Sequence, residues 1–97
     1  MIKVLLTRTQ TIVEGHANFA EHGKDVVCGA VSTLTCALIN SLEKLTQEEI
    51  GYTVKSGYVN IQHHIKTPEG RLLRDSFVIN IMELAEEYKK YISVEYT

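Results

Sequence analysis

The sequence predicts an α+β fold, a two-layer sandwich in which two helices pack on one face of a β-sheet. Three observations carry this prediction. Short β-branched runs alternate with two longer amphipathic stretches, the predicted order is ββαββαβ, and no repeat or low-complexity segment interrupts it. The chain has 97 residues, 44% of them hydrophobic, which is enough for one core. We therefore expect a single domain over residues 1–97.

The predicted strands are short runs of β-branched and aliphatic residues bounded by turn-forming residues. They cover residues 2–9, 11–14, 51–55, 58–65 and 91–96. In the fourth run, Val59, Ile61 and His63 share one side, because successive strand residues point to opposite faces.

The first predicted helix begins at its cap, Asp25, whose carboxylate can accept from the free N–H groups of the first turn. Its apolar residues recur at spacings of three or four: Val27, Val31, Leu34, Leu38, Leu42 and Leu45. Ala30, Cys36, Ala37 and Ile39 broaden that stripe. We therefore expect a largely buried helix with Cys36 in the core.

The second predicted helix covers residues 76–90, with Phe77, Ile81, Leu84 and Tyr88 on one face. Residues 67–70 come before it and are predicted to form a turn, because Pro68 presets φ and Gly70 allows a positive φ.

Charge and composition exclude several classes of protein. The net charge of −2 and the pI near 6.1 argue against a nucleic-acid-binding protein. The start lacks the features of a signal peptide, and no run approaches the roughly 20 apolar residues of a membrane span. We therefore expect a cytoplasmic protein that does not bind membranes, with both cysteines reduced. Cys28 and Cys36 lie about 12 Å apart along one predicted helix, too far for a disulfide.

Cys28 is the candidate nucleophile. It lies three residues after the predicted cap, and thiols at helix N-termini ionise more readily than free cysteine. The first-turn N–H groups could also bind the oxyanion of an acyl-transfer intermediate. Gly29 leaves room there for a substrate carbonyl.

His16 is the candidate base. A loop of about ten residues separates it from the helix of Cys28 and can fold the imidazole onto the thiol. Asp25 could orient that imidazole as well as cap the helix, and His22 is the rival base. Chemistry alone leaves the alternative open, because a cysteine near a helix start is more often an inert hydrophobic residue.

Two segments resemble the signature blocks of the ribosomal-processing cysteine protease (Prp) family. They are Gly15-His16-Ala17 and the run from Asp25 through Val26-Val27-Cys28-Gly29-Ala30-Val31 to Ser32. The resemblance implies His16 as base and Cys28 as nucleophile, with Asp25 and Ser32 supporting them and no cofactor or metal. Residues of the same blocks and the loop between them are expected to bind substrate: Gly15, Ala17, Phe19 and Gly29.

The same resemblance implies a substrate and an assembly. Members remove an N-terminal extension from the large-subunit ribosomal protein L-twenty-seven and are homodimeric. This chain departs from the family pattern at Gly29, where alanine is usual, and at Glu14, where serine is common. Neither change touches the proposed dyad, so they bear on fine specificity.

Some other residues have two interpretations. Ser32 is expected to bond a backbone carbonyl one turn back rather than act in catalysis. Phe19 either lines a pocket for an aromatic side chain or packs the loop on the core. His63 and His64 point to opposite sides of a strand and cannot chelate one ion together.

Two other functions remain open from the sequence. The chain could be a noncatalytic module that docks on a ribosomal protein through the same groove, or, more remotely, a redox-sensing thiol. The redox reading lacks a resolving cysteine in reach of Cys28.

Overall fold

The computed structural model describes residues 1–21 and 24–97. Its elements follow the predicted order. They are β1 (Ile2–Leu6), β2 (Gln10–Glu14), α1 (Val26–Leu45), β3 (Ile50–Lys55), β4 (Tyr58–His63), α2 (Pro68–Glu87) and β5 (Ile92–Tyr96).

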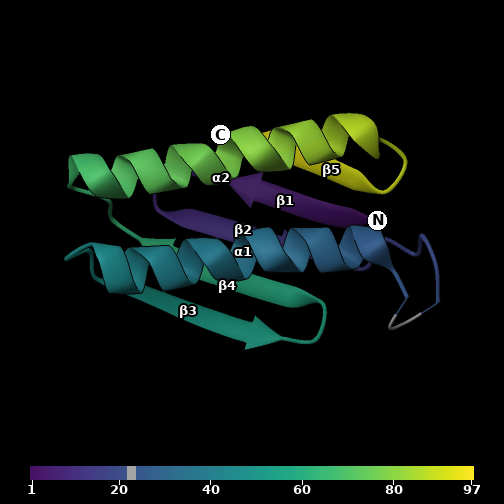
Figure 1. Ribbon diagram of the computed structural model, residues 1–97, viewed down its shortest axis with the longest axis horizontal. Coiled ribbons are helices and arrows are strands. Elements are labelled where there is room, and N and C mark those ends of the chain that lie inside the picture. Colours follow the sequence, from purple (N-terminus) through teal and green to yellow (C-terminus); the bar gives the residue numbers. More distant parts are fainter. Residues whose placement is uncertain (22–23) are drawn as a thin grey trace.

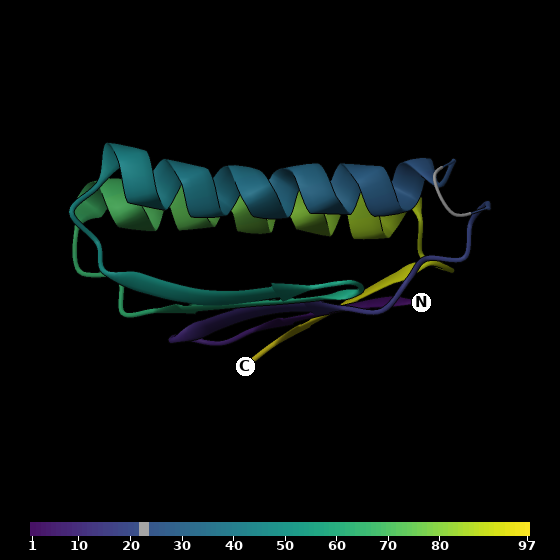
Figure 2. The same ribbon diagram turned by 90° about the horizontal axis from the view of Figure 1, so that it is seen from below.

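The five strands form one sheet in the order β3-β4-β2-β1-β5. Neighbouring strands are antiparallel, except that β1 and β5 run parallel. Both helices lie on the same face of this sheet, and the opposite face carries no helix (Figure 1, Figure 2). The predicted two-layer sandwich is confirmed.

The core lies between the helices and the covered face of the sheet. Alternate strand residues point into it, as the period of a strand requires. The most deeply buried apolar residues come from both layers: Val4, Leu6, Val27, Val31, Leu42, Ile61 and Ile81. The helices therefore supply one apolar stripe each.

Helix α1 is less buried than its composition predicts. Cys36 is exposed, so its predicted place in the core is wrong, and Ala37 is exposed as well. The buried face of α1 consists of Val27, Val31, Thr35, Leu38, Ile39 and Leu42. Leu45, which the predicted stripe included, is exposed, so that part of the prediction is wrong. By length and composition alone α1 could cross a membrane, contrary to the sequence prediction, but a helix packed on a core passes the same test.

Helix α2 begins eight residues earlier than predicted. Thr67 is its N-cap and accepts from the Gly70 N–H at 3.0 Å, and Pro68 occupies the first helical turn. Proline suits that position because its missing N–H would have no helical partner there. The residues interpreted as a turn are thus the start of the helix.

Two strands end earlier than predicted. Strand β1 stops at Leu6, because the Thr7 hydroxyl accepts from the Gln10 N–H at 2.9 Å and closes the hairpin turn. Strand β4 stops at His63, where it pairs with Ile50 at the start of β3.

Candidate active site

Cys28 lies in the first turn of α1 and is half-buried. The turn is built by Asp25, the N-cap, whose Oδ1 accepts from the N–H groups of Val27 and Cys28, both at 3.0 Å. Val27 is fully buried and anchors the turn to the core. The predicted cap is therefore confirmed, and it fixes the main chain of the cysteine directly.

The other carboxylate oxygen of Asp25 holds the loop that follows His16. Its Oδ2 accepts from the Phe19 N–H at 2.9 Å and from the Ala20 N–H at 3.4 Å. Hydrogen bonds from the Cys28 N–H and from these loop N–H groups lower the pKa of Asp25, against a smaller opposing effect of desolvation. Asp25 thus joins the helix of Cys28 to the loop of His16.

The main chain of that loop reaches the sulfur itself. The N–H of Ala17 points at Cys28 Sγ with a nitrogen–sulfur distance of 3.3 Å. Ala17 is buried, so this contact is part of the packed structure. The residue after the candidate base therefore lies against the candidate nucleophile, although eleven positions separate them in the chain.

The His16 imidazole is exposed and lies against Gly57 in the β3–β4 turn. Within residues 1–21 and 24–97, no hydrogen bond joins it to Cys28 or Asp25. One of the two roles predicted for Asp25 was to orient the imidazole. Asp25 does not do so in this structure. The rival base, His22, lies outside the described residues.

The predicted oxyanion site needs correction. The N–H groups of Val27 and Cys28 are taken by Asp25 Oδ1, and that of Gly29 by the Asp25 carbonyl at 3.0 Å. Three of the first-turn donors are therefore already used inside the helix. The donor that faces the sulfur is the Ala17 N–H, which the sequence pattern could not single out.

The other residues predicted for the site are Gly29, Ser32 and Phe19, and each has a different environment. A Cβ on Gly29 would meet nothing within 4 Å, so this side of the first turn is open. Ser32 is exposed and its hydroxyl makes no hydrogen bond to the described residues, so its predicted bond to a carbonyl one turn back is wrong. Thr35 makes a bond of that kind, to the Val31 carbonyl. Phe19 packs edge-on against Tyr88 and Tyr91, which supports the packing interpretation.

Two glycines with positive φ lie next to His16, at positions where a Cβ would collide with a neighbouring group. Gly15 has a φ of +96°, and a Cβ there would collide with the Met1 carbonyl oxygen. Gly57 has a φ of +70° and contacts the His16 ring. The sequence indicated a turn at Gly57, but nothing in it placed that turn beside His16.

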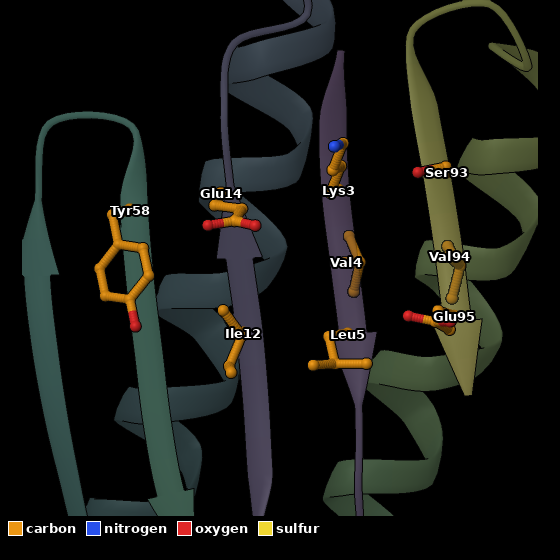
Figure 3. Close-up of a pocket in the computed structure, with 9 residues that line it drawn as sticks. All are labelled: Lys3, Val4, Leu5, Ile12, Glu14, Tyr58, Ser93, Val94 and Glu95. Atoms are coloured by element: carbon orange, nitrogen blue, oxygen red, sulfur yellow. The ribbon is translucent and has the colours of Figure 1, made fainter. Parts of the chain in front are cut away.

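One hollow of the surface lies away from the thiol. It crosses the uncovered face of the sheet and is lined by side chains of β1, β2, β4 and β5, including Lys3, Leu5, Ile12, Glu14 and Tyr58 (Figure 3). Neither His16 nor Cys28 lines it. It is therefore a separate surface from the one that carries the thiol.

A thiol at the start of a helix, beside a loop that carries a histidine, is the arrangement of a cysteine peptidase. Comparison with known proteins gives the same class. Residues 1–93 match the family model described as "Cysteine protease Prp". The chain belongs to this family and is a cysteine protease.

Relatives match most of the chain. The ribosomal processing cysteine protease Prp of Staphylococcus aureus is 29% identical over 91 residues, 91% of this chain and 86% of that protein. The Bacillus subtilis protein of the same name is 30% identical over 87 residues, 82% of this chain and 78% of that protein. The S. aureus Prp structure with a covalently linked product peptide superposes with a TM-score of 0.94, at 26% identity and full coverage of both chains.

Proposed function

We propose that this cysteine protease removes the N-terminal extension of the large-subunit ribosomal protein L-twenty-seven, with Cys28 as nucleophile and His16 as base. The observation that carries the assignment is the contact of the Ala17 N–H with Cys28 Sγ, which brings the two family motifs together. The names of the relatives, which describe ribosomal processing, support the substrate class.

In this mechanism His16 accepts the thiol proton and Cys28 Sγ attacks the carbonyl carbon of the scissile bond. His16 then returns the proton to the leaving amine, and a water molecule hydrolyses the thioester to release the acid and the free thiol. When the sulfur bonds to carbon, the Ala17 N–H, which points at Sγ, could donate to the oxyanion.

The other predicted residues fit the same reaction. Asp25 supports the site by holding both the helix and the loop, and Ser32 lies one turn after Cys28 on the open side of α1. Phe19, Gly29 and the Gly15–Ala17 segment would contact the substrate, a role supported by the contact of the Ala17 N–H with Cys28 Sγ and by the open space at Gly29. The reaction requires no metal or cofactor.

We further propose a cytoplasmic homodimer that binds neither nucleic acid nor membrane. The uncovered sheet face is the candidate interface, because it combines the half-buried Leu5 and Ile12 with charges of both signs, Lys3 opposite Glu14 (Figure 3). A second copy related by a two-fold axis could place its Lys3 against Glu14 of the first copy. Sedimentation of the wild type and of Leu5→Arg tests this: a monomeric wild type would exclude the dimer.

The decisive experiment is incubation of the purified protein with the extended ribosomal protein, followed by mass spectrometry of the new N-terminus. Cys28→Ala and His16→Ala should abolish cleavage, whereas Cys36→Ala should retain it. Unchanged substrate binding without turnover in the wild type would instead indicate the noncatalytic docking module.

Alkylation of the two thiols offers a second readout. Exposure favours Cys36, since Cys28 is half-buried under the Ala17 N–H. A Cys28 that still reacts faster near pH 6.5 is therefore activated by its surroundings. Slow, equal labelling would count against the dyad.

A further inference from the structure

Gly57, in the turn between β3 and β4, lies directly against the His16 imidazole. A Cβ atom on Gly57 would be 2.7 Å from Nε2, 3.2 Å from Cε1 and 3.4 Å from Cδ2 of that ring. A Cβ contact of 2.7 Å is not tolerated in folded proteins, so one of the two groups would have to move. The ring therefore occupies the space that any other residue at position 57 would fill.

The same glycine holds the main chain next to His16. Its carbonyl accepts from the Gly15 N–H at 2.8 Å, and the backbone nitrogen of Met1 donates to the His16 carbonyl at 2.7 Å. On the other side, Ala17 contacts Cys28 Sγ. The segment from Gly15 to Ala17 is thus fixed by three separate parts of the chain.

Turn geometry alone does not require glycine at position 57. Its φ of +70° lies in the left-handed region, which asparagine also adopts readily in turns. The contact with the imidazole is a second requirement, and asparagine fails it because it carries a Cβ. Only glycine satisfies both conditions.

We propose that Gly57 is a positioning residue for the base of this protease. It provides a seat for the imidazole that lacks a Cβ, and it bonds the residue that precedes His16, so it sets where the ring lies relative to Cys28. The inference rests on the proposed Cys28–His16 dyad.

The activity test uses Gly57→Asn, which keeps the turn conformation and adds the Cβ. We expect kcat to fall by about 100-fold with KM nearly unchanged, and the acid limb of the pH profile to move, because a small misplacement of a catalytic group has effects of this size. The matched control is Gly51→Ala in β3, whose Cβ would meet only the Gln62 side chain, at 3.3 Å. It should cleave within about twofold of wild type. An unchanged or raised kcat in Gly57→Asn would overturn the proposal.

A double-mutant cycle tests the contact without using activity. Gly57→Ala is compared in the wild type and in His16→Ala, since backbone strain is present in both and the ring collision only in the wild type. The melting temperature should fall clearly more in the wild-type background, and a variant that folds only with His16→Ala gives the same result in a stronger form. Equal falls of the melting temperature in both backgrounds would show that Gly57 does not provide the space for the His16 ring. Because this cycle needs no substrate, its result can be interpreted even if the assignment of the Cys28–His16 dyad fails.

Discussion

The N-termini of α1 and α2 are both held by a carboxylate, at opposite ends of the molecule (Figure 1). At α1 the carboxylate is the N-cap itself, Asp25. At α2 the N-cap is Thr67, and Glu48 reinforces it from the α1–β3 connection. The Oε2 of Glu48 accepts from the Thr67 N–H at 2.7 Å and from the Thr67 hydroxyl at 2.6 Å. Both carboxylate oxygens of Glu48 also accept from the Lys66 N–H.

The two ends differ in what the carboxylate connects. Glu48 joins two connections that carry no reactive group, and its side chain fills the space beside Gly70 in the first turn of α2. Asp25 joins the turn of Cys28 to the loop after His16 and leaves the space at Gly29 open. A closed cap stabilises a helix, whereas an open one, tied to a loop with a base, can also admit a substrate.

The largest difference should appear when each carboxylate is changed to its amide. Asp25→Asn replaces one accepting oxygen with a donor and releases either the helix turn or the loop, so kcat/KM should fall by about 100-fold. Glu48→Gln alters only the α2 end and should leave kcat/KM within about twofold. Steady-state peptide cleavage at pH 7 measures both. Similar losses in the two variants would mean that the α1 cap has no special link to the site.

How much of this could be predicted depends on sequence distance. The cap by Asp25, the thiol of Cys28 and the first helix follow from residues within one turn of each other, and the family motif adds His16. The signals that begin α2, Thr67 as N-cap and Pro68 in the first turn, are local, but the same residues also fit a turn, so the predicted start of α2 is eight residues too late. The reinforcement of that cap by Glu48, nineteen residues before Thr67, has no local signal. Cys36 was misplaced because composition does not show which side of a helix the sheet covers.

The contact partners of His16 were also out of reach of the sequence. Gly57 lies forty-one positions after it, and only the pairing of β2 with β4 brings the two together. The oxyanion donors were misassigned for a related reason. A cap satisfies the first-turn N–H groups that would otherwise be free, so an efficient cap by Asp25 removes them from catalysis.

The two ends of the molecule also differ in how their stability depends on pH. His63, at the α2 end, is buried with its Nε2 2.9 Å from the Thr11 hydroxyl. Burial, aided by the nearby positive charge of Arg74 and partly opposed by Glu48, lowers the pKa of His63 from 6.5 to about 4. The folded state therefore favours the neutral ring, and its stabilising effect is complete above pH 6.5 and is lost as the pH falls toward 4.

This titration should reduce the free energy of unfolding by about 2 kcal/mol between pH 7 and pH 5. His63→Gln should remove most of that pH dependence, and His64→Gln, at an exposed neighbour, should keep it. Urea unfolding at the two pH values measures the effect. The carboxylate caps respond at lower pH, because the pKa values of Asp25 and Glu48 are both lowered from ordinary values near 4. Equal pH dependence in wild type and His63→Gln would assign the acid loss to other groups.

The smallest effect compares one substitution at the two helix starts. Gly29→Ala in α1 adds a methyl group that meets nothing within 4 Å, so it should raise the free energy of unfolding by about 0.5–1 kcal/mol through lower backbone entropy of the unfolded chain. Gly70→Ala in α2 should instead lower the melting temperature. Its Cβ would lie 2.5 Å from Glu48 Oε2 and 2.9 Å from the Thr67 hydroxyl oxygen, and so would displace a carboxylate held by several hydrogen bonds.

Thermal unfolding of the two alanine variants at pH 7 decides whether one end is open and the other closed. Opposite signs of the shift are expected, since the methyl group added in Gly29→Ala meets nothing within 4 Å and leaves the Asp25 bonds in place. A loss of activity without a loss of stability in Gly29→Ala would show that the substrate itself uses that space. Destabilisation by both substitutions would mean that the start of α1 is closed as well, and the contrast between the two caps would fail.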